Sequence, residues 1–118
     1  MNRLSMLCAA IGLTLLAGAA AAQPAVAPPD PARGKAVFDR WCAMCHAAGP
    51  MHGGTAALEV KYHGDKPPEL ERRTDLTPDV VRLFVRRGMN IMPPFRKTEV
   101  GDADLEALAA YLSAGPAR

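Results

Sequence analysis

Apolar residues recur at helical spacing in three stretches of the chain, and no stretch shows the strict alternation that predicts a strand. The apolar positions of the first stretch are Val37, Phe38, Trp41 and Met44. Asp30 before this stretch is a suitable N-cap, and Pro31 suits the first helical position, where its missing N–H costs no hydrogen bond. The pattern therefore predicts a helix that begins after Asp30 and extends to Cys45.

The other two stretches have equally clear ends. The apolar positions of the second are Val80, Val81, Phe84 and Val85. Thr77 as N-cap, Pro78 at the first position and Gly88 after the last apolar residue mark the limits of this helix. The third helix is expected to begin at Gly101 or Asp102. Its apolar positions are Leu105, Leu108, Ala109 and Leu112.

Glycine and proline interrupt the segments between these helices. Between residues 47 and 68, only the stretch 55–62 is suited to a short helix, and Pro93 and Pro94 make the segment 89–98 a loop. We therefore predict an all-α fold of three main helices with a further short one.

The N-terminal segment is typical of an export signal. Arg3 gives it a positive start, Leu4 to Leu16 is almost wholly apolar, and Ala20 to Ala22 are the small residues that a signal peptidase accepts. The apolar core is shorter than the roughly 20 residues that span a bilayer. We expect cleavage near Ala22, no stable membrane insertion afterwards, and a periplasmic protein. The expected divisions are a signal at 1–22, a flexible lead-in at 23–29, a domain at 30–114 and a tail at 115–118.

Size and charge exclude two broad classes of function. The 118 residues suffice for one small domain, which excludes a two-domain enzyme. Lys and Arg number 14 against 12 Asp and Glu, so the chain has no basic field for binding nucleic acid by charge. Without residues 1–22, the chain keeps 96 residues and a net charge of +1, because Arg3 is the one charge removed. A domain of this size is marginal on its own, so we expect a non-protein group to complete its core.

Cys42, Cys45 and His46 form the pattern Cys-x-x-Cys-His. This is the attachment pattern of a c-type haem, in which the two thiols form thioethers with the vinyl groups and the histidine offers an imidazole nitrogen to the iron. A thioredoxin-like redox pair would need a preceding strand, and a structural zinc site would need more cysteine ligands; the sequence offers neither. We therefore expect one covalently bound haem c.

A haem that carries electrons needs a second axial ligand, normally Met or His. The candidates are Met51, His52, His63, Met89 and Met92. Met92 is favoured because Pro93 and Pro94 after it hold a non-helical loop that can present a thioether. Met89, three residues earlier in the same loop, is the first alternative.

The order of these features resembles the class I c-type cytochromes. The resemblance rests on Cys42 to His46, on the run from Gly88 to Phe95, and on a final helix that starts with acidic residues and ends at Leu112. Within that class, the run from Pro68 to Phe95, and especially Arg86, Arg87 and Gly88 before the Met-Pro loop, resembles the small cytochrome subunits that accept electrons from flavoprotein dehydrogenases of the p-cresol methylhydroxylase type.

The resemblance implies a role for each residue of the expected site. It makes Cys42 and Cys45 the thioether links, His46 the proximal iron ligand and Met92 the distal ligand. Orientation of the proximal imidazole then falls to a proline carbonyl that accepts its other N–H, which also strengthens the ligand.

Pro68 fits the position of that carbonyl best, and Pro50 is the alternative. The segment 47–67 is longer than expected for the family, so His52, Tyr62 and His63 within it have no assigned counterpart in the family. Arg72 and Arg73 are candidates for pairing with a haem propionate, against the simpler interpretation that both are solvated.

Family geometry also gives Gly34 and Phe38 a purpose. The first and last helices cross closely in this fold, so Gly34 lets the two backbones approach while Phe38 packs near Leu108 and Tyr111.

The expected function is one-electron transfer, because an iron with two protein ligands has no open position for oxygen or substrate. Two kinds of redox partner fit: a dehydrogenase, with the flavoprotein type favoured, or a terminal oxidase supplied by a diffusing shuttle. A charge near zero favours a stable complex held by apolar contact. A haem enzyme or sensor with a displaceable Met92 is a third interpretation.

Overall fold

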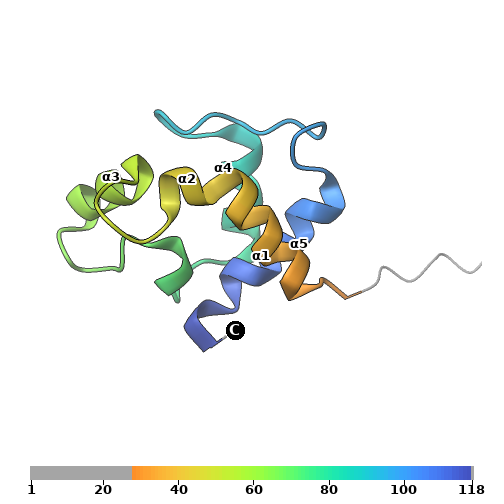
Figure 1. Cartoon of the computed structure of the whole chain (residues 1–118), viewed down its shortest axis with the longest axis horizontal. Helices are drawn as coiled ribbons and strands as arrows, with labels where there is room; N and C mark the ends of the chain where they lie inside the picture. Colours follow the sequence, from red (N-terminus) through yellow and green to blue (C-terminus); the bar gives the residue numbers. More distant parts are fainter. Residues whose placement is uncertain (1–27, 118) are drawn as a thin grey trace, which may run out of the picture.

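The computed structural model describes residues 28–117; the expected signal segment 1–22 and residues 23–27 of the expected lead-in lie outside this range. The elements in chain order are α1 (Pro31–Val37), η1 (Phe38–Cys42), α2 (Ala43–His46), α3 (Gly53–Tyr62), η2 (Leu70–Arg72), α4 (Pro78–Arg87), α5 (Asp102–Ser113) and η3 (Gly115–Ala117). Figure 1 shows helices joined by loops, and the described residues contain no strand beyond a single bridge between Met89 and Met92. The all-α prediction is confirmed.

Helices α1 and α5 cross at very short distance. A Cβ added to Gly34 would lie 2.3 Å from the carbonyl oxygen of Ala107 and 2.5 Å from Cβ of Tyr111. Phe38 and Leu108 are each 1% exposed, and the rings of Phe38 and Tyr111 lie 6.2 Å apart. The close crossing expected from the family geometry is therefore present, and it fixes the centre of the core.

Helix α4 packs against α5 and completes the core. Its buried residues Val81 and Val85 join the same hydrophobic cluster as Leu108. At the surface of this pair, Arg82 Nε donates to Glu106 at 2.8 Å. Arg86 donates to the carbonyl oxygens of Phe95 and Val100 at 3.1 and 2.8 Å, which holds the loop after α4 against the helix.

The ends of the helices follow the expected capping residues. The Asp30 carboxylate accepts from the backbone N–H of Ala32 at 2.9 Å, and the Thr77 hydroxyl accepts from that of Val80 at 3.3 Å. Helix α4 ends before Gly88, and α5 begins at Asp102. The short helix α3 begins at Gly53, two residues earlier than the stretch expected from the sequence.

The first helix contains a change of register that the sequence pattern does not indicate. Residues Phe38–Cys42 form a π-helical segment between α1 and α2, and the N–H of Ala43 donates to the carbonyl oxygen of Phe38. A π segment amounts to one residue inserted into an α-helix, which turns the residues after it by about 100°. The directions of Cys45 and His46 relative to the face of Gly34 therefore depend on this segment.

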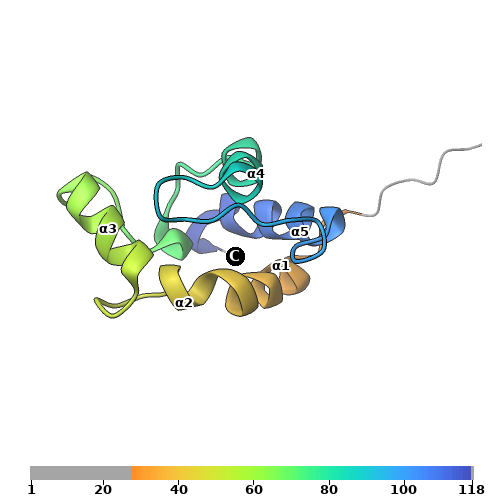
Figure 2. The same ribbon diagram turned by 90° about the horizontal axis from the view of Figure 1, so that it is seen from above.

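Helix α3 stands apart from the other helices. In the view from above, α3 lies at one end of the described chain beside α2, while α4 and α5 lie away from it (Figure 2).

At the C-terminal end of the described residues, the expected tail begins with η3, and Gly115 is buried beside Arg73.

The crossing predicts a strong effect of Gly34→Ala. The added methyl group would overlap the backbone of Ala107, so α1 and α5 would have to separate, at a cost of about 2 kcal/mol or more in the free energy of unfolding. Urea unfolding of the haem-loaded protein measures this cost. Ala36→Ser, at an exposed site on the same helix, is the control and should stay within about 0.5 kcal/mol of the wild type. Equal unfolding midpoints for Gly34→Ala and the control would contradict the close crossing.

Candidate haem site

A cavity of about 650 Å³ lies between α2, α3, α4 and the loop after α4. Its lining is mainly apolar and includes Trp41, Leu58, Leu76, Phe84, Phe95 and Leu112. Leu108 of the core cluster also reaches it. Apolar cavities of this size are typical of cofactor and ligand sites.

The three residues of the Cys-x-x-Cys-His pattern line one wall of this cavity. Cys42 is partly buried, Cys45 is exposed, and both are free thiols. Burial, with a smaller contribution from the neighbouring Cys45, raises the pKa of the Cys42 thiol to about 12. Burial also lowers the pKa of His46, so its imidazole is neutral near pH 7, which is the form that binds a metal.

Met92 and Met89 line the cavity from the loop after α4. Their backbones exchange two hydrogen bonds of 3.0 and 2.9 Å, which close a tight turn around Asn90 and Ile91. Met92 is partly buried and packs against the core cluster, whereas Met89 is 48% exposed. The structure thus brings both loop methionines to the cavity that contains His46, and the choice of Met92 as ligand stays a prediction.

The other candidate axial ligands do not line the cavity. Met51 is 91% exposed. His52 Nδ1 lies 2.9 Å from the carbonyl oxygen of Met44, and since that oxygen can only accept, His52 donates there. His63 is exposed and lies at the C-terminal end of α3, with a φ of 50°.

The expected hydrogen bond from His46 to a proline carbonyl is absent. His46 Nδ1 is buried and has no hydrogen-bond partner, so neither Pro68 nor Pro50 accepts from it. Pro68 also does not line the cavity, although Leu70 two residues later does. The physical reason is local packing, because the backbone of Gly54 occupies the space beside this edge of the ring: a Cβ there would lie 2.8 Å from Nδ1.

A charged cluster forms another part of the cavity wall. Arg73 is 5% exposed, and its guanidinium donates twice to Asp75, at 2.6 and 2.8 Å. Lys66 donates to the same carboxylate at 2.6 Å. The Arg73 guanidinium also lies over the ring of Tyr62, 4.6 Å from its centroid. The two cations hold the pKa of the Asp75 carboxyl well below its usual range.

These contacts separate the two arginines that the sequence placed together. The Arg72 side chain is 68% exposed and does not line the cavity, whereas Arg73 does. Tyr62 belongs to this cluster, because its ring packs under the Arg73 guanidinium. The sequence patterns do not indicate Lys66 or Asp75 as residues of the site. The short spacing between Arg73 and Asp75 is a local signal for that ion pair, and Lys66 has none. With Lys66 included, the cluster carries one positive charge in excess, which suits an anionic group of a ligand in the cavity.

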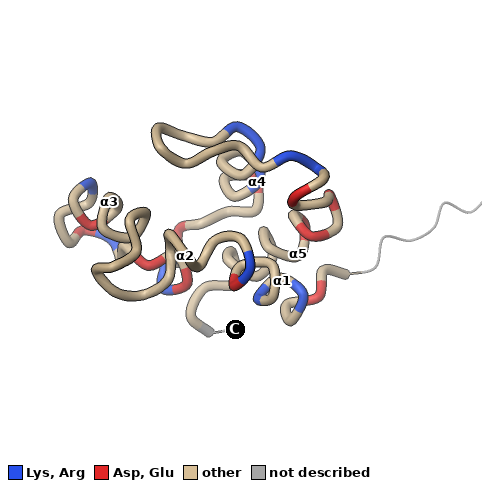
Figure 3. Tube along the Cα trace, turned by 45° about the horizontal axis from the view of Figure 1, so that its top comes forward, with Lys and Arg blue, Asp and Glu red and all other residues tan. Residues whose placement is uncertain are grey.

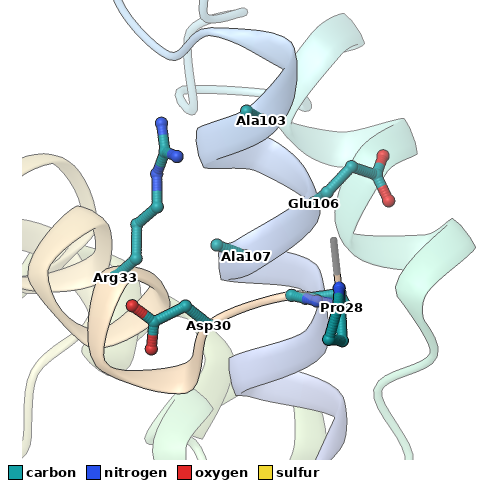
Figure 4. Close-up of a pocket in the computed structure, with 7 residues that line it drawn as sticks. Pro28, Asp30, Arg33, Ala103, Glu106 and Ala107 are labelled. Carbon is teal, nitrogen blue, oxygen red and sulfur yellow. The ribbon is translucent and has the colours of Figure 1, made fainter. Parts of the chain in front are cut away.

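A second, smaller cavity of about 370 Å³ lies at the start of α1 (Figure 4). Figure 4 shows Asp30 and Arg33 on one side and Ala103, Glu106 and Ala107 of α5 on the other. Its lining residues include no thiol, imidazole or thioether, so the cofactor is expected in the larger cavity.

The residues of the larger cavity fit a c-type haem. Two thiols, a neutral imidazole and a thioether reach a single apolar space, and the cationic excess at its wall complements a carboxylate. Within residues 28–117, no three His, Cys, Asp or Glu residues gather in a group that could hold a metal ion.

Two properties of the described surface bear on partners. Basic and acidic residues are interspersed along the trace (Figure 3). Over the same part of the chain, no helix has the length and apolar character needed to cross a membrane.

Comparison with known proteins identifies a related family. The family model described as cytochrome c oxidase, cbb3-type, subunit III, matches residues 29–112. Neither curated proteins nor solved structures show significant similarity to the chain.

Proposed function

Since the chain belongs to the c-type cytochromes of the family described as cytochrome c oxidase, cbb3-type, subunit III, we propose that it is a periplasmic monohaem electron carrier that serves a dehydrogenase. Membership of this family implies a covalently bound haem c with its iron, and electron transfer as the general function. The periplasmic location rests on the composition of residues 1–22.

One observation supports the assignment of the site: Cys42, Cys45, His46 and Met92 all line the same apolar cavity. Cys42 and Cys45 would hold the haem through thioethers, and His46 and Met92 would bind its iron. When bound, the haem supplies a metal centre that gains and loses single electrons. The apolar side chains of the cavity would shield the haem from water, and an iron bound by both His46 and Met92 would leave no position for a substrate.

The ligands and walls of the site favour a high reduction potential. A thioether is a weaker donor than imidazole, so Met92 opposite His46 favours ferrous iron. Apolar walls such as Phe84 and Leu112 disfavour the additional charge of the ferric state. We therefore expect a midpoint well above the range of haems with two histidine ligands.

Met92→Ala tests the distal ligand. Removal of the thioether should abolish the sulfur-to-iron absorption band of the oxidised protein and change its reduction potential. The matched control is Met89→Ala, which removes a thioether from the same turn and should leave the band in place.

Persistence of the band in Met92→Ala, with its loss in Met89→Ala, would transfer the ligand to Met89. A strongly negative midpoint in the wild type would contradict a methionine ligand altogether. A high-spin absorption spectrum in the resting protein would instead favour the interpretation as a haem enzyme or sensor.

Two observations support a dehydrogenase as the partner. One is the exposed apolar surface beside the cavity, and the other is the resemblance of the segment around Arg86 and Arg87 to the cytochrome subunits of flavoprotein dehydrogenases. Ile91, at the rim of the cavity, is 85% exposed, and Met89 beside it is half exposed. An apolar rim and a surface of mixed charge suit a complex held by contact and not by long-range attraction. A second candidate is delivery of electrons to a terminal oxidase, which the description of the matched family favours.

Co-purification of the protein from the soluble and membrane fractions of the native cells distinguishes a dehydrogenase partner from a terminal oxidase. We expect the wild-type protein to retain a flavoprotein through moderate salt, and Ile91→Asp to lose it while keeping its haem. Charge at an exposed rim position should not disturb the fold. Recovery with an oxidase complex, or as a monomer without a flavoprotein, would contradict the dehydrogenase assignment.

A further inference from the structure

The first turn of α3 lies directly against the imidazole of His46. A Cβ added to Gly54 would be 2.6 Å from Cε1 and 2.8 Å from Nδ1 of His46, and 2.7 Å from the carbonyl oxygen of Cys45. Real Cβ atoms do not approach heavy atoms this closely. The neighbouring Gly53, in the same helical turn, has no atom within 4 Å of its own added Cβ. The contact with His46 is therefore specific to position 54.

Two hydrogen bonds fasten this turn on both sides of His46. The hydroxyl of Thr55, which is 3% exposed, donates to the carbonyl oxygen of Ala47 at 2.8 Å. On the other side, the ring of His52 donates from Nδ1 to the carbonyl oxygen of Met44 at 2.9 Å. Because Met44 and Ala47 flank Cys45 and His46, these bonds set the distance between α3 and the motif.

Packing, and not hydrogen bonding, restrains the imidazole. His46 Nδ1 is buried without a hydrogen-bond partner, so no acceptor fixes the rotation of the ring. A ligating histidine normally has a partner on its second nitrogen, which orients the ring. The backbone of Gly54 lies at this edge instead, so the orientation of the ring depends on how the first turn of α3 is fastened.

We propose that the first turn of α3 positions His46 as an iron ligand: Gly54 limits the rotation of the imidazole, and Thr55 and His52 hold Gly54 in place. These three are positioning residues, since they act through His46. The proposal rests on the assignment of His46 as an axial ligand under the proposed function. It gives a role to the first part of the segment 47–67, which the family resemblance leaves without one.

The test compares Gly54→Ala with Gly53→Ala in the haem-loaded full chain. Both variants add one methyl group to the same helical turn, so their effects on helix propensity match. Mass spectrometry should find haem attached in both, because Cys42 and Cys45 are unchanged. Gly53 also lines the cavity, but its added Cβ meets no protein atom within 4 Å, so Gly53→Ala should keep the paramagnetically shifted NMR signals of the His46 ring in their wild-type positions.

Gly54→Ala should displace those ring signals and raise the reduction potential, because a less well-placed imidazole is a weaker donor to ferric iron. Equal potentials and ring signals in the two variants would overturn the proposal. If Gly54→Ala yields no folded haem protein, Thr55→Val decides, since it keeps the shape of the side chain and removes the hydrogen bond to Ala47. Thr55→Val should shift the ring signals in the same way, and wild-type signals would overturn the proposal.

His46→Ala separates this proposal from the one on which it rests. If its absorption spectrum equals that of the wild type, His46 is not a ligand and the proposed site itself fails. If the spectrum changes while Gly54→Ala behaves like Gly53→Ala, the ligand assignment stands and the positioning role is wrong.

Discussion

The stability of the fold depends on what fills a large apolar cavity that the side chains of the chain leave open. Protein interiors are packed as densely as organic crystals, so a cavity of about 650 Å³ at the centre of a small domain removes a large part of its possible core. The crossing of α1 and α5 at Gly34 and Ala107 supplies a closely packed region, and α4 extends it. Helix α3 and the loop of Met89 and Met92 lie around the cavity and depend on its contents for support. A covalently bound haem supplies the missing apolar centre.

The chemistry of the site follows from the same arrangement. The π-helical segment Phe38–Cys42 turns the end of the first helix, so the helix that packs on α5 also carries Cys42 and His46 to the cavity wall. Burial at this wall keeps the His46 imidazole neutral and available to a metal. The structure therefore couples stability to function, because one group completes the core and performs the electron transfer.

The sequence predicts the helices and the cofactor well because their signals are local. Asp30, Thr77 and Pro78 mark helix starts, and the spacing of Cys42, Cys45 and His46 has one strong chemical interpretation. The pattern does not predict the π segment, since its residues retain apolar periodicity. It also assigns Pro68 to a hydrogen bond that the structure lacks, because the position of α3 against His46 is a tertiary contact. The clustering of Lys66, Arg73 and Asp75 around Tyr62 is likewise invisible to local patterns.

The central claim is that the haem completes the core, and removal of its attachment tests this most directly. In the double variant Cys42→Ala and Cys45→Ala, the chain cannot form thioethers, so haem can be withheld or washed out. Far-UV circular dichroism with urea unfolding then compares this variant with the haem-loaded wild type. The account predicts a largely unfolded chain with little helical signal and no cooperative transition. A cooperative transition close to that of the haem-loaded protein would contradict it.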